Sequence, residues 1–220
     1  PAGASLSERR AADLRAVLAD HPYVLVIEDD HFSMLSRSPF RSIIGPGHRR
    51  WALVRSVSKF LGPDMCLAVT ASDAETADRL AMRLSPGTTW VSHLLQRLVL
   101  ALATDPGVAS DIRAAGAHYA ARNDAFATRL TALGVPTVAG DGLNLWVPLP
   151  VPARDVSEQL MRRGWLARAG DEFVLGAASA GARLRLTVHD LSDADADRLA
   201  TDVAAAVAAA GGRRSPAGME

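Results

Sequence analysis

Cysteine is nearly absent from this sequence, because Cys66 is the only one in 220 residues. A single cysteine excludes an internal disulfide framework and a metal site built from several cysteines, and it fits a reducing compartment. Long apolar runs are also missing: a bilayer crossing needs roughly 20 such residues, and the stretch 94–103 carries Gln96 and Arg97. We therefore expect a cytoplasmic protein without a membrane span and without a bound metal.

An excess of charge of either sign is missing as well. The formal net charge is zero, and the 24 basic residues lie in short pairs such as Arg49 and Arg50. A nucleic-acid surface usually gathers its basic residues into one patch or stripe, so we expect contact with DNA only through a segment absent from this chain. With 49% hydrophobic and 22% charged residues, the composition is that of a globular chain with one sizeable core or two small ones.

Lysine is the other scarce residue, since 23 of the 24 basic side chains are arginine and Lys59 is the single lysine. A genome rich in G and C explains the scarcity but not the position of the one that remains. Arginine cannot replace the primary amine that condenses with an aldehyde. Lys59 is therefore a candidate for covalent attachment of an aldehyde, and the alternative is a solvated surface lysine.

Hydrophobic periodicity divides the sequence into two parts. The first part predicts a helix over 6–20 capped by Ser7, apolar strands over 23–27, 51–57 and 65–71, and helices over 73–84, capped by Asp73, and 89–104. An unbroken apolar run such as 23–27 is typical of a strand buried on both faces of a parallel sheet. After a long bridging helix over 105–133, the second part predicts strands over 143–147, 173–175 and 183–188, helices over 153–163 and 192–210, and a disordered tail over 211–220.

Two chemically distinct side chains follow the first two strands: Asp29 after the first and Lys59 after the second. In an open parallel sheet, ligands bind at the carboxyl ends of the strands. A carboxylate and a lysine there suggest pyridoxal phosphate, because the carboxylate keeps the pyridine nitrogen protonated while the lysine forms the resting aldimine and later serves as the base at Cα. Ser56 and Ser58 flank Lys59 as candidate phosphate or positioning ligands. A strand-end carboxylate is the simpler interpretation of Asp29, as it is of its two acidic neighbours.

Three phrases carry a resemblance to a known family: Val-Ile-Glu-Asp-Asp at 26–30, Ser-Val-Ser-Lys-Phe-Leu-Gly-Pro-Asp at 56–64, and Arg-Leu-Thr-Val at 185–188. Together they resemble the class I and II aminotransferases of fold type I. More closely, they resemble the aminotransferase-like effector domains of MocR-type regulators, in which a GntR-like winged helix precedes that domain, and in particular the vitamin B6-related PtsJ type. The resemblance covers nearly all of residues 1–210.

This resemblance implies an α/β fold that is the C-terminal part of its family's architecture. The expected organisation is a partial pyridoxal-phosphate-binding large domain over 1–104, the bridging helix over 105–133, and a small α+β domain over 134–210. The start Pro1-Ala2-Gly3 resembles the end of the family's Asn-Pro-x-Gly turn. We therefore expect that the asparagine of that turn, and the phosphate-binding loop of the large domain, precede residue 1.

Carried over residue by residue, the resemblance implies that Lys59 is the aldimine lysine, that Asp29 contacts the pyridine nitrogen, and that Arg185 binds a substrate carboxylate. A guanidinium suits the last task because it can bind a carboxylate bidentately, and Arg183 shares a strand face with Arg185. His31 stands where the regulators often have a tyrosine that contacts the cofactor's phenolic oxygen. An imidazole can do similar work, and the alternative is a plain loop histidine.

The sequence also departs from the family. Where the family usually has an arginine that grips the cofactor phosphate, seven residues after the lysine, this chain has Cys66. Loss of that contact costs about 1.5–3 kcal/mol, or roughly tenfold to a hundredfold in affinity. Arg55 is a candidate to compensate, and we expect Cys66 to be a small buried apolar residue. Thr89 is a weaker candidate, for contact with a neighbouring subunit's phosphate.

Three functional classes stay open on this basis. In the first, the chain is part of a regulator that senses pyridoxal phosphate or an amino compound through the Lys59 aldimine. In the second, it is part of a free-standing aminotransferase that acts on an amino acid. In the third, it has no ligand function of its own. We expect a small amine or amino acid as ligand, a homodimer as the assembly, and weak cofactor binding without turnover by the chain alone.

Overall fold

A computed structural model of the chain describes residues 3–85, 87, 90–174 and 182–212. Helices and strands are mixed, which confirms the predicted α/β class. In chain order the elements are α1 (Glu8–Ala19), β1 (Val26–Asp30), the 3₁₀ helix η1 (Ser33–Leu35), β2 (Trp51–Ser56), β3 (Ala68–Ser72), α2 (Ala74–Leu84), α3 (His93–Thr104), α4 (Pro106–Ala132), β4 (Leu145–Pro148), α5 (Ala153–Arg162), β5 (Arg168–Ala169), the 3₁₀ helix η2 (Gly170–Phe173), β6 (Arg183–Leu186) and α6 (Asp193–Gly212).

The chain divides into two compact units. The amino-terminal unit is Ser5–Gly116, and the carboxyl-terminal unit joins Pro1–Ala4 to Ala117–Glu220. Helix α4 contributes residues to both units. The predicted domain boundaries at residues 104 and 133 stay predictions.

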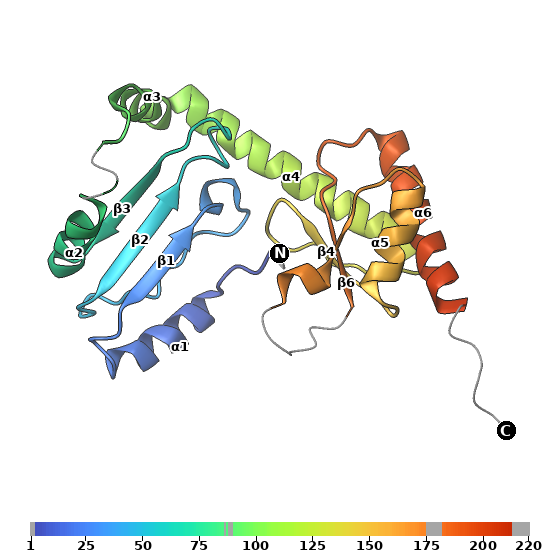
Figure 1. Cartoon of the computed structure of the whole chain (residues 1–220), viewed down its shortest axis with the longest axis horizontal. Helices are drawn as coiled ribbons and strands as arrows, with labels where there is room; N and C mark the ends of the chain where they lie inside the picture. The colour runs from blue at the N-terminus through green and yellow to red at the C-terminus, as the bar shows by residue number, and fades with distance from the viewer. Residues whose placement is uncertain (1–2, 86, 88–89, 175–181, 213–220) are drawn as a thin grey trace. The chain divides into compact units, whose positions relative to one another are not determined.

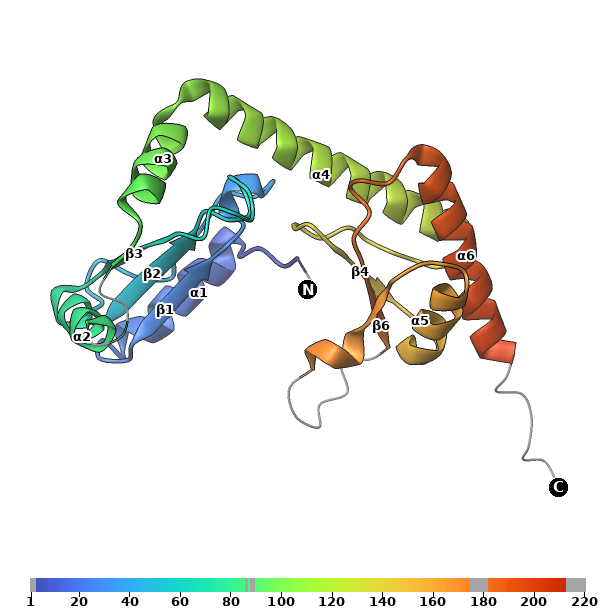
Figure 2. The same cartoon turned by 45° about the horizontal axis from the view of Figure 1, so that its top comes forward.

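The sheet of the amino-terminal unit has the strand order β1-β2-β3. Strands β1 and β2 are parallel, and Figures 1 and 2 show α1 lying along one face beside them. Strand β3 is antiparallel to β2, so the expectation of a parallel sheet is wrong for this strand. The connection between β2 and β3 contains no helix, whereas a parallel return needs a crossover that is usually helical.

Strand β1 begins at Val26, three residues later than predicted, and it contains the acidic residues that we expected to follow it. The backbone N–H of Val24 donates to the carbonyl of His21, which keeps the preceding residues in a turn. The prediction that this strand is buried on both faces is also wrong, since Ile27 is 63% exposed. Strand β1 is an edge strand of the three-stranded sheet, because β2 pairs with it on one side only.

Helices α1 and α2 begin where their capping residues predict. The Ser7 hydroxyl accepts from the backbone N–H of Arg10 at the start of α1, and the Asp73 carboxylate accepts from that of Thr76 at the start of α2. Helix α3 starts at His93 rather than at residue 89, and Thr89 itself lies outside the described residues. Side-chain oxygens at these positions satisfy helix N–H groups that have no partner within the helix.

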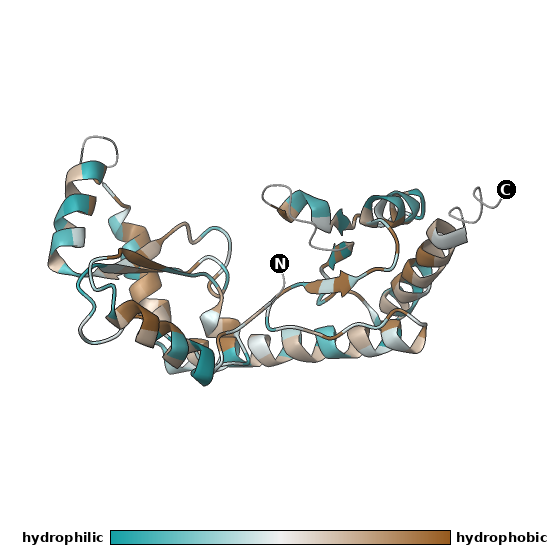
Figure 3. Cartoon of the chain, turned by 90° about the horizontal axis from the view of Figure 1, so that it is seen from below, coloured by the Kyte–Doolittle hydropathy of each residue, from teal (hydrophilic) through white to brown (hydrophobic). Residues whose placement is uncertain are grey.

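Helix α3 is apolar along most of its length, as the hydropathy colouring in Figure 3 shows. Val99 is its buried residue, whereas Leu94 is 80% exposed. Small residues allow close packing at the next helix, α4: a Cβ on Gly116 would lie 2.7 Å from the carbonyl oxygen of Leu35. A side chain at this position would therefore push η1 away from α4. None of the helices that the structure describes combines the length and apolar character that a bilayer crossing needs.

The carboxyl-terminal unit has an antiparallel sheet in the order β4-β6-β5, with α5 and α6 packed together. Its core gathers fully buried apolar side chains from α4, both long strands, α5 and α6, for example Leu130, Leu145, Leu160, Leu184 and Val203. The prediction that one face of the strand near residue 185 points to the core is confirmed, because Leu184 and Leu186 are buried.

Two predicted features of this unit need correction. Phe173 belongs to η2 and not to a strand over 173–175, of which Leu175 lies outside the described residues. The third strand of this sheet, which pairs with β6 on the side away from β4, is instead β5. It is only two residues long, and apolar periodicity cannot reveal so short a segment. Helix α6 continues through Gly212, so residues 211 and 212 are not part of a disordered tail, and the rest of that prediction falls outside the described residues.

Candidate functional site

Backbone pairing between β1 and β2 decides which side chains share a face of the sheet. Asp29 pairs with Val54, and Asp30 pairs with Arg55. Paired residues point to the same face, and successive residues along a strand alternate. Asp29 and Ser56 therefore lie on one face at the carboxyl ends of the two strands, while Asp30 and Arg55 lie on the other.

Asp30 belongs to the scaffold. Its carboxylate accepts hydrogen bonds from the backbone N–H groups of Phe32 and Ser33, from the Ser33 hydroxyl at 2.5 Å, and from Arg55 Nε at 2.7 Å. Burial alone would raise the pKa of Asp30, but the hydrogen bonds from Ser33 and Arg55 outweigh it and hold the pKa below its ordinary value. The carboxylate is thus ionised and fully used in tying β2 to the turn after β1.

Glu28 is also part of the scaffold, since its carboxylate accepts from the Ser42 hydroxyl at 2.9 Å and from the backbone N–H of Ile43 at 2.7 Å. Asp29 differs from both neighbours. Its side chain is 59% exposed, and its hydrogen bond is to His31 Nε2 at 3.0 Å. Among the three adjacent acids, Asp29 is the one whose carboxylate faces solvent. One of its two oxygens is hydrogen-bonded to His31.

Lys59 sits in a tight turn directly after β2. The backbone N–H groups of Phe60 and Leu61 both donate to the carbonyl of Val57, whose own N–H donates to that of Leu67. The apolar Val57 side chain is buried and anchors the turn, while Lys59 is exposed. Burial of Val57 thus leaves the ammonium group of Lys59 on the surface at the end of the strand.

A recess of about 490 Å³ lies beside this turn, lined by Ser56, Ser58, Lys59, Pro63, Cys66, Leu67 and Ala68. The two serine hydroxyls are 2.9 Å apart, so they form one polar edge. Among the described residues, no carboxylate forms an ion pair with Lys59. The volume is within the usual range for small-ligand sites of roughly 300–1,000 Å³, and the lining offers an amine and two hydroxyl donors. These groups fit a phosphorylated aldehyde such as pyridoxal phosphate.

The recess corrects two expectations. Cys66 is exposed and lines the recess, so the prediction that it is a small buried residue is wrong. Its thiol donates to the carbonyl of Pro63 at 3.5 Å, on the turn that carries the chain back towards β3. Arg55 does not compensate for the missing arginine, because alternation points it to the opposite face and its guanidinium is bonded to Asp30.

Arg185 lies on the sheet of the other unit. It pairs with Trp146 on one side and with Arg168 on the other, so these three side chains form a row across β4, β6 and β5. The guanidinium of Arg185 lies 5.4 Å from the ring centroid of Phe173, and that of Arg168 lies 5.3 Å from it. No carboxylate among the described residues pairs with Arg185, which leaves its donors available to an anion.

Sequence reasoning missed Trp146 and Phe173. Alternation along a strand predicts that Trp146 faces away from the buried Leu145, but it does not predict that Arg185 lies opposite. Phe173 was assigned to a strand, whereas it stands at the end of η2, where its ring meets that of Trp146 edge-on with centroids 5.8 Å apart. The pairing of β4 with β6 brings Trp146 beside Arg185, and the pairing of β5 with β6 brings η2 and Phe173 there.

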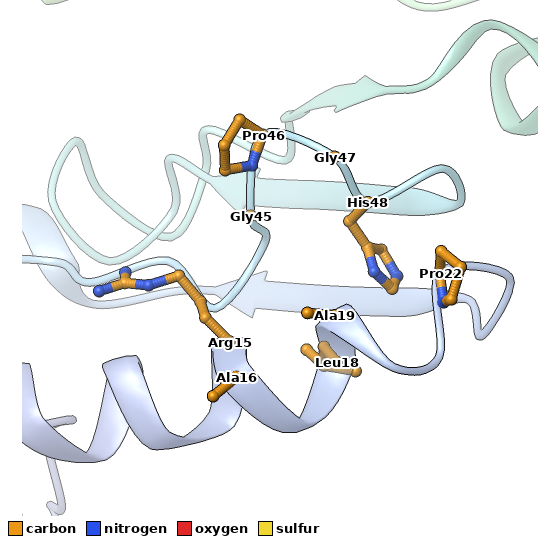
Figure 4. A pocket seen from close by; sticks show the side chains of 9 residues that line it. All are labelled: Arg15, Ala16, Leu18, Ala19, Pro22, Gly45, Pro46, Gly47 and His48. Carbon is orange, nitrogen blue, oxygen red and sulfur yellow. The ribbon is translucent and has the colours of Figure 1, made fainter.

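A further pocket, of about 450 Å³, lies between α1 and the loop 45–48, as Figure 4 shows. Its polar groups are used within the protein: Arg15 donates to the carbonyl of Ser42 and to Glu8, and His48 Nε2 lies 2.7 Å from the carbonyl oxygen of Val24. The rest of the lining is mostly alanine, leucine, proline and glycine. Unlike the recess beside Lys59, its lining offers no primary amine to an aldehyde.

The chain belongs to the class I and II aminotransferase family, because the model of that family matches residues 1–203. Pyridoxal phosphate is the cofactor of this family. The vitamin B6 salvage pathway transcriptional repressor PtsJ of Salmonella typhimurium is 45% identical over 203 residues, which are 92% of this chain and 47% of the repressor. The resemblance identified in the sequence is confirmed.

Solved structures give the same fold. A kynurenine aminotransferase of Pyrococcus horikoshii, in complex with PMP, matches with a TM-score of 0.83 at 18% identity over 98% of this chain and 55% of its own. The α-aminoadipate aminotransferase LysN of Thermus thermophilus matches with a TM-score of 0.81 at 17% identity over 97% of this chain and 57% of its own. The chain thus spans about half the length of the relatives that it matches.

Proposed function

We propose that this chain is part of the aminotransferase-like effector domain of a transcriptional regulator, and that this domain binds pyridoxal phosphate covalently at Lys59. The observation that carries the proposal is the arrangement at the carboxyl ends of β1 and β2. Asp29 and Ser56 share one face there, and Lys59 shares a recess with Ser56 and Ser58. The 45% identity to the repressor PtsJ supports regulation over metabolism.

Each residue of this arrangement has a separate task in the proposal. Lys59 supplies the primary amine that attaches the aldehyde carbon, and Ser56 and Ser58 donate hydrogen bonds to the phosphate. Asp29 keeps the pyridine nitrogen protonated, and His31, hydrogen-bonded to Asp29 at 3.0 Å, positions that carboxylate beside the ring. When bound, the cofactor supplies an electron sink for the pair that a breaking bond at an amino-acid Cα leaves behind.

Arg185 is the proposed receptor for the carboxylate of a small amino compound. Its guanidinium is held over an aromatic ring and has no carboxylate partner among the described residues. An arginine with free donors on a fixed strand can bind a carboxylate through two parallel hydrogen bonds. This role, the identity of the amino compound, the homodimer, a cytoplasmic location and the contact with DNA through another segment all stay proposals.

The alternative function is that of an aminotransferase, favoured by the enzymes whose folds this chain shares. Both functions use the same residues, and they differ in the event that ligand binding triggers. A regulator changes its binding to DNA when the ligand is present, whereas an aminotransferase converts the amino acid to an oxo acid. A search for a basic winged-helix segment encoded before residue 1 separates the two.

The single lysine makes the direct test simple. The chain is mixed with pyridoxal phosphate, reduced with borohydride, digested and mapped by mass spectrometry. We expect a phosphopyridoxyl group on Lys59 and its loss in the Lys59→Arg variant, which keeps the charge but has no primary amine. Modification of the amino terminus alone would mean that this chain has no covalent site for the cofactor.

A further inference from the structure

The ion pair between Arg168 and Glu172 lies beside Arg185 and has no role in the proposed function. Arg168 Nε and one of its terminal nitrogens both donate to the same carboxylate oxygen of Glu172, at 2.9 and 2.6 Å. Glu172 lies in η2, next to Phe173, and Arg168 lies in β5 directly opposite Arg185. The two guanidinium groups share the Phe173 ring, at 5.3 and 5.4 Å from its centroid.

Without Glu172, two cations would stand side by side on one face of the sheet. Paired residues on neighbouring strands have their Cβ atoms roughly 4.5–5.5 Å apart, and like charges in such a pair repel. The Glu172 carboxylate neutralises Arg168 and engages two nitrogens of its guanidinium. The row therefore presents one uncompensated guanidinium, that of Arg185, instead of two.

The aromatic rings restrict the ligand further. Trp146 flanks Arg185 on the side opposite Arg168, and its ring meets Phe173 edge-on. A Cβ on Gly170 would lie 3.0 Å from the Trp146 ring and 2.8 Å from the carbonyl oxygen of Arg183, so η2 packs closely against both strands. The surroundings of Arg185 are thus apolar on one side and hold a neutralised ion pair on the other.

We propose that the Glu172–Arg168 ion pair restricts the Arg185 site to ligands with one carboxylate. The inference rests on the proposed role of Arg185 as a carboxylate receptor and adds the class of ligand: a monocarboxylate whose remaining part is neutral or aromatic. A dicarboxylate gains little from Arg168 for its second charge while Glu172 is paired with that guanidinium. Removal of the Glu172 charge frees a second cation next to the first.

The test compares two probes, propionate with one carboxylate and succinate with two. Their dissociation constants are measured by titrating the side-chain Nε–H signals of the ¹⁵N-labelled chain at low ionic strength, with Arg185→Lys identifying the Arg185 signal. We expect Glu172→Gln to tighten succinate binding about threefold to tenfold and to change propionate binding less than twofold. Salt should reduce the gain, because both groups are partly exposed.

Two further variants control the result. Glu158→Gln removes an equal charge from another exposed glutamate of the same unit, paired with Arg162 four residues on, and should leave the ratio of the two constants unchanged. Adding Arg168→Gln to Glu172→Gln should abolish the gain, because the cation that Glu172→Gln releases is then absent.

The outcomes separate this inference from the function on which it rests. If Glu172→Gln leaves succinate binding unchanged while propionate still shifts the Arg185 signal, the ion pair does not select the ligand and Arg185 remains a receptor. If neither probe shifts that signal in the unsubstituted chain, Arg185 does not bind carboxylates and both ideas are wrong.

Discussion

Replacing Asp29 and Asp30 separately by asparagine should change different properties of the chain, although the two residues are adjacent. Asp30→Asn should lower the free energy of unfolding of the amino-terminal unit, while Asp29→Asn should leave it almost unchanged. For cofactor affinity at matched folded fraction, Asp29→Asn should be the harmful change. The contrast follows from strand alternation, which directs Asp30 to Arg55 and Asp29 to the face that carries Ser56.

The magnitudes follow from the contacts. Asp30 is 6% exposed, and an asparagine oxygen can keep its backbone hydrogen bonds but not the charge-assisted ones from Ser33 and Arg55. Such bonds contribute about 1.5–3 kcal/mol each, and the 37% exposure of the Arg55 side chain reduces its share. We expect a loss of about 2–3 kcal/mol. Asp29→Asn removes one exposed contact and should cost less than about 0.5 kcal/mol.

Acid should remove the difference in free energy of unfolding between the Asp30→Asn variant and the unsubstituted chain. The pKa of Asp30 in the folded protein lies below the 3.8 of an unperturbed aspartate. Unfolding therefore takes up a proton in acid, and the stability that this carboxylate contributes is present above pH 3.8 and lost as pH falls through the folded-state pKa. Urea unfolding followed by circular dichroism measures the stability difference at neutral pH and its decrease near pH 3.

Cofactor affinity gives the second half of the comparison. A lost contact between a carboxylate and the protonated pyridine nitrogen should weaken binding roughly tenfold to a hundredfold, measured from the absorbance of bound pyridoxal phosphate. The reasoning is refuted if Asp29→Asn destabilises the chain as much as Asp30→Asn does, or if Asp30→Asn weakens the cofactor at unchanged stability.

The remaining predictions concern Asp73 and Cys66. Hydrogen bonds from Thr76 and the backbone N–H of Trp51 lower the pKa of Asp73 to about 2, so its contribution to stability should be lost as pH falls from 3.8 towards about 2. Asp73→Asn should flatten this part of the acid unfolding curve, and an unchanged curve would show that the cap does not couple to folding. Cys66→Arg should tighten pyridoxal phosphate binding, since position 66 lines the recess with Lys59, whereas Cys66→Ser should not. Equal affinities of the two variants for pyridoxal phosphate would mean that its phosphate does not lie near position 66.

The sequence predicted the helices well because their ends carry local chemistry. Ser7 and Asp73 cap α1 and α2 in the structure, as their side chains and positions suggest. The alternation of arginine and leucine in β6 also predicted correctly which face is buried. Such signals lie within a few residues of one another, so no tertiary contact is needed to recognise them.

The start of β1 could not be predicted in the same way. The apolar residues 23–25 have the pattern of a strand, yet they lie before β1. The reason is that the parallel pairing with β2 begins at Val26 and Trp51. Register depends on a partner strand 25 residues away in the sequence, and the pattern within one strand does not specify it.

The candidate site shows the same limit. Alternation tells that Asp29 and Asp30 face opposite ways, but only the pairing with β2 tells which of them meets Arg55 and which shares a face with Ser56. Cys66 was assigned to the core from its residue type, whereas the turn after Lys59 brings it to the surface of the recess. A contact between strands decides the roles of the two aspartates, and the path of a turn decides that of Cys66.

The most direct test of the account is a crystal structure of this chain grown with pyridoxal phosphate. We predict electron density continuous from Lys59 Nζ to the cofactor, with the ring nitrogen within hydrogen-bonding distance of Asp29 and the phosphate near Ser56 and Ser58. Cofactor density between α1 and the loop 45–48, with Lys59 unmodified, would contradict the account.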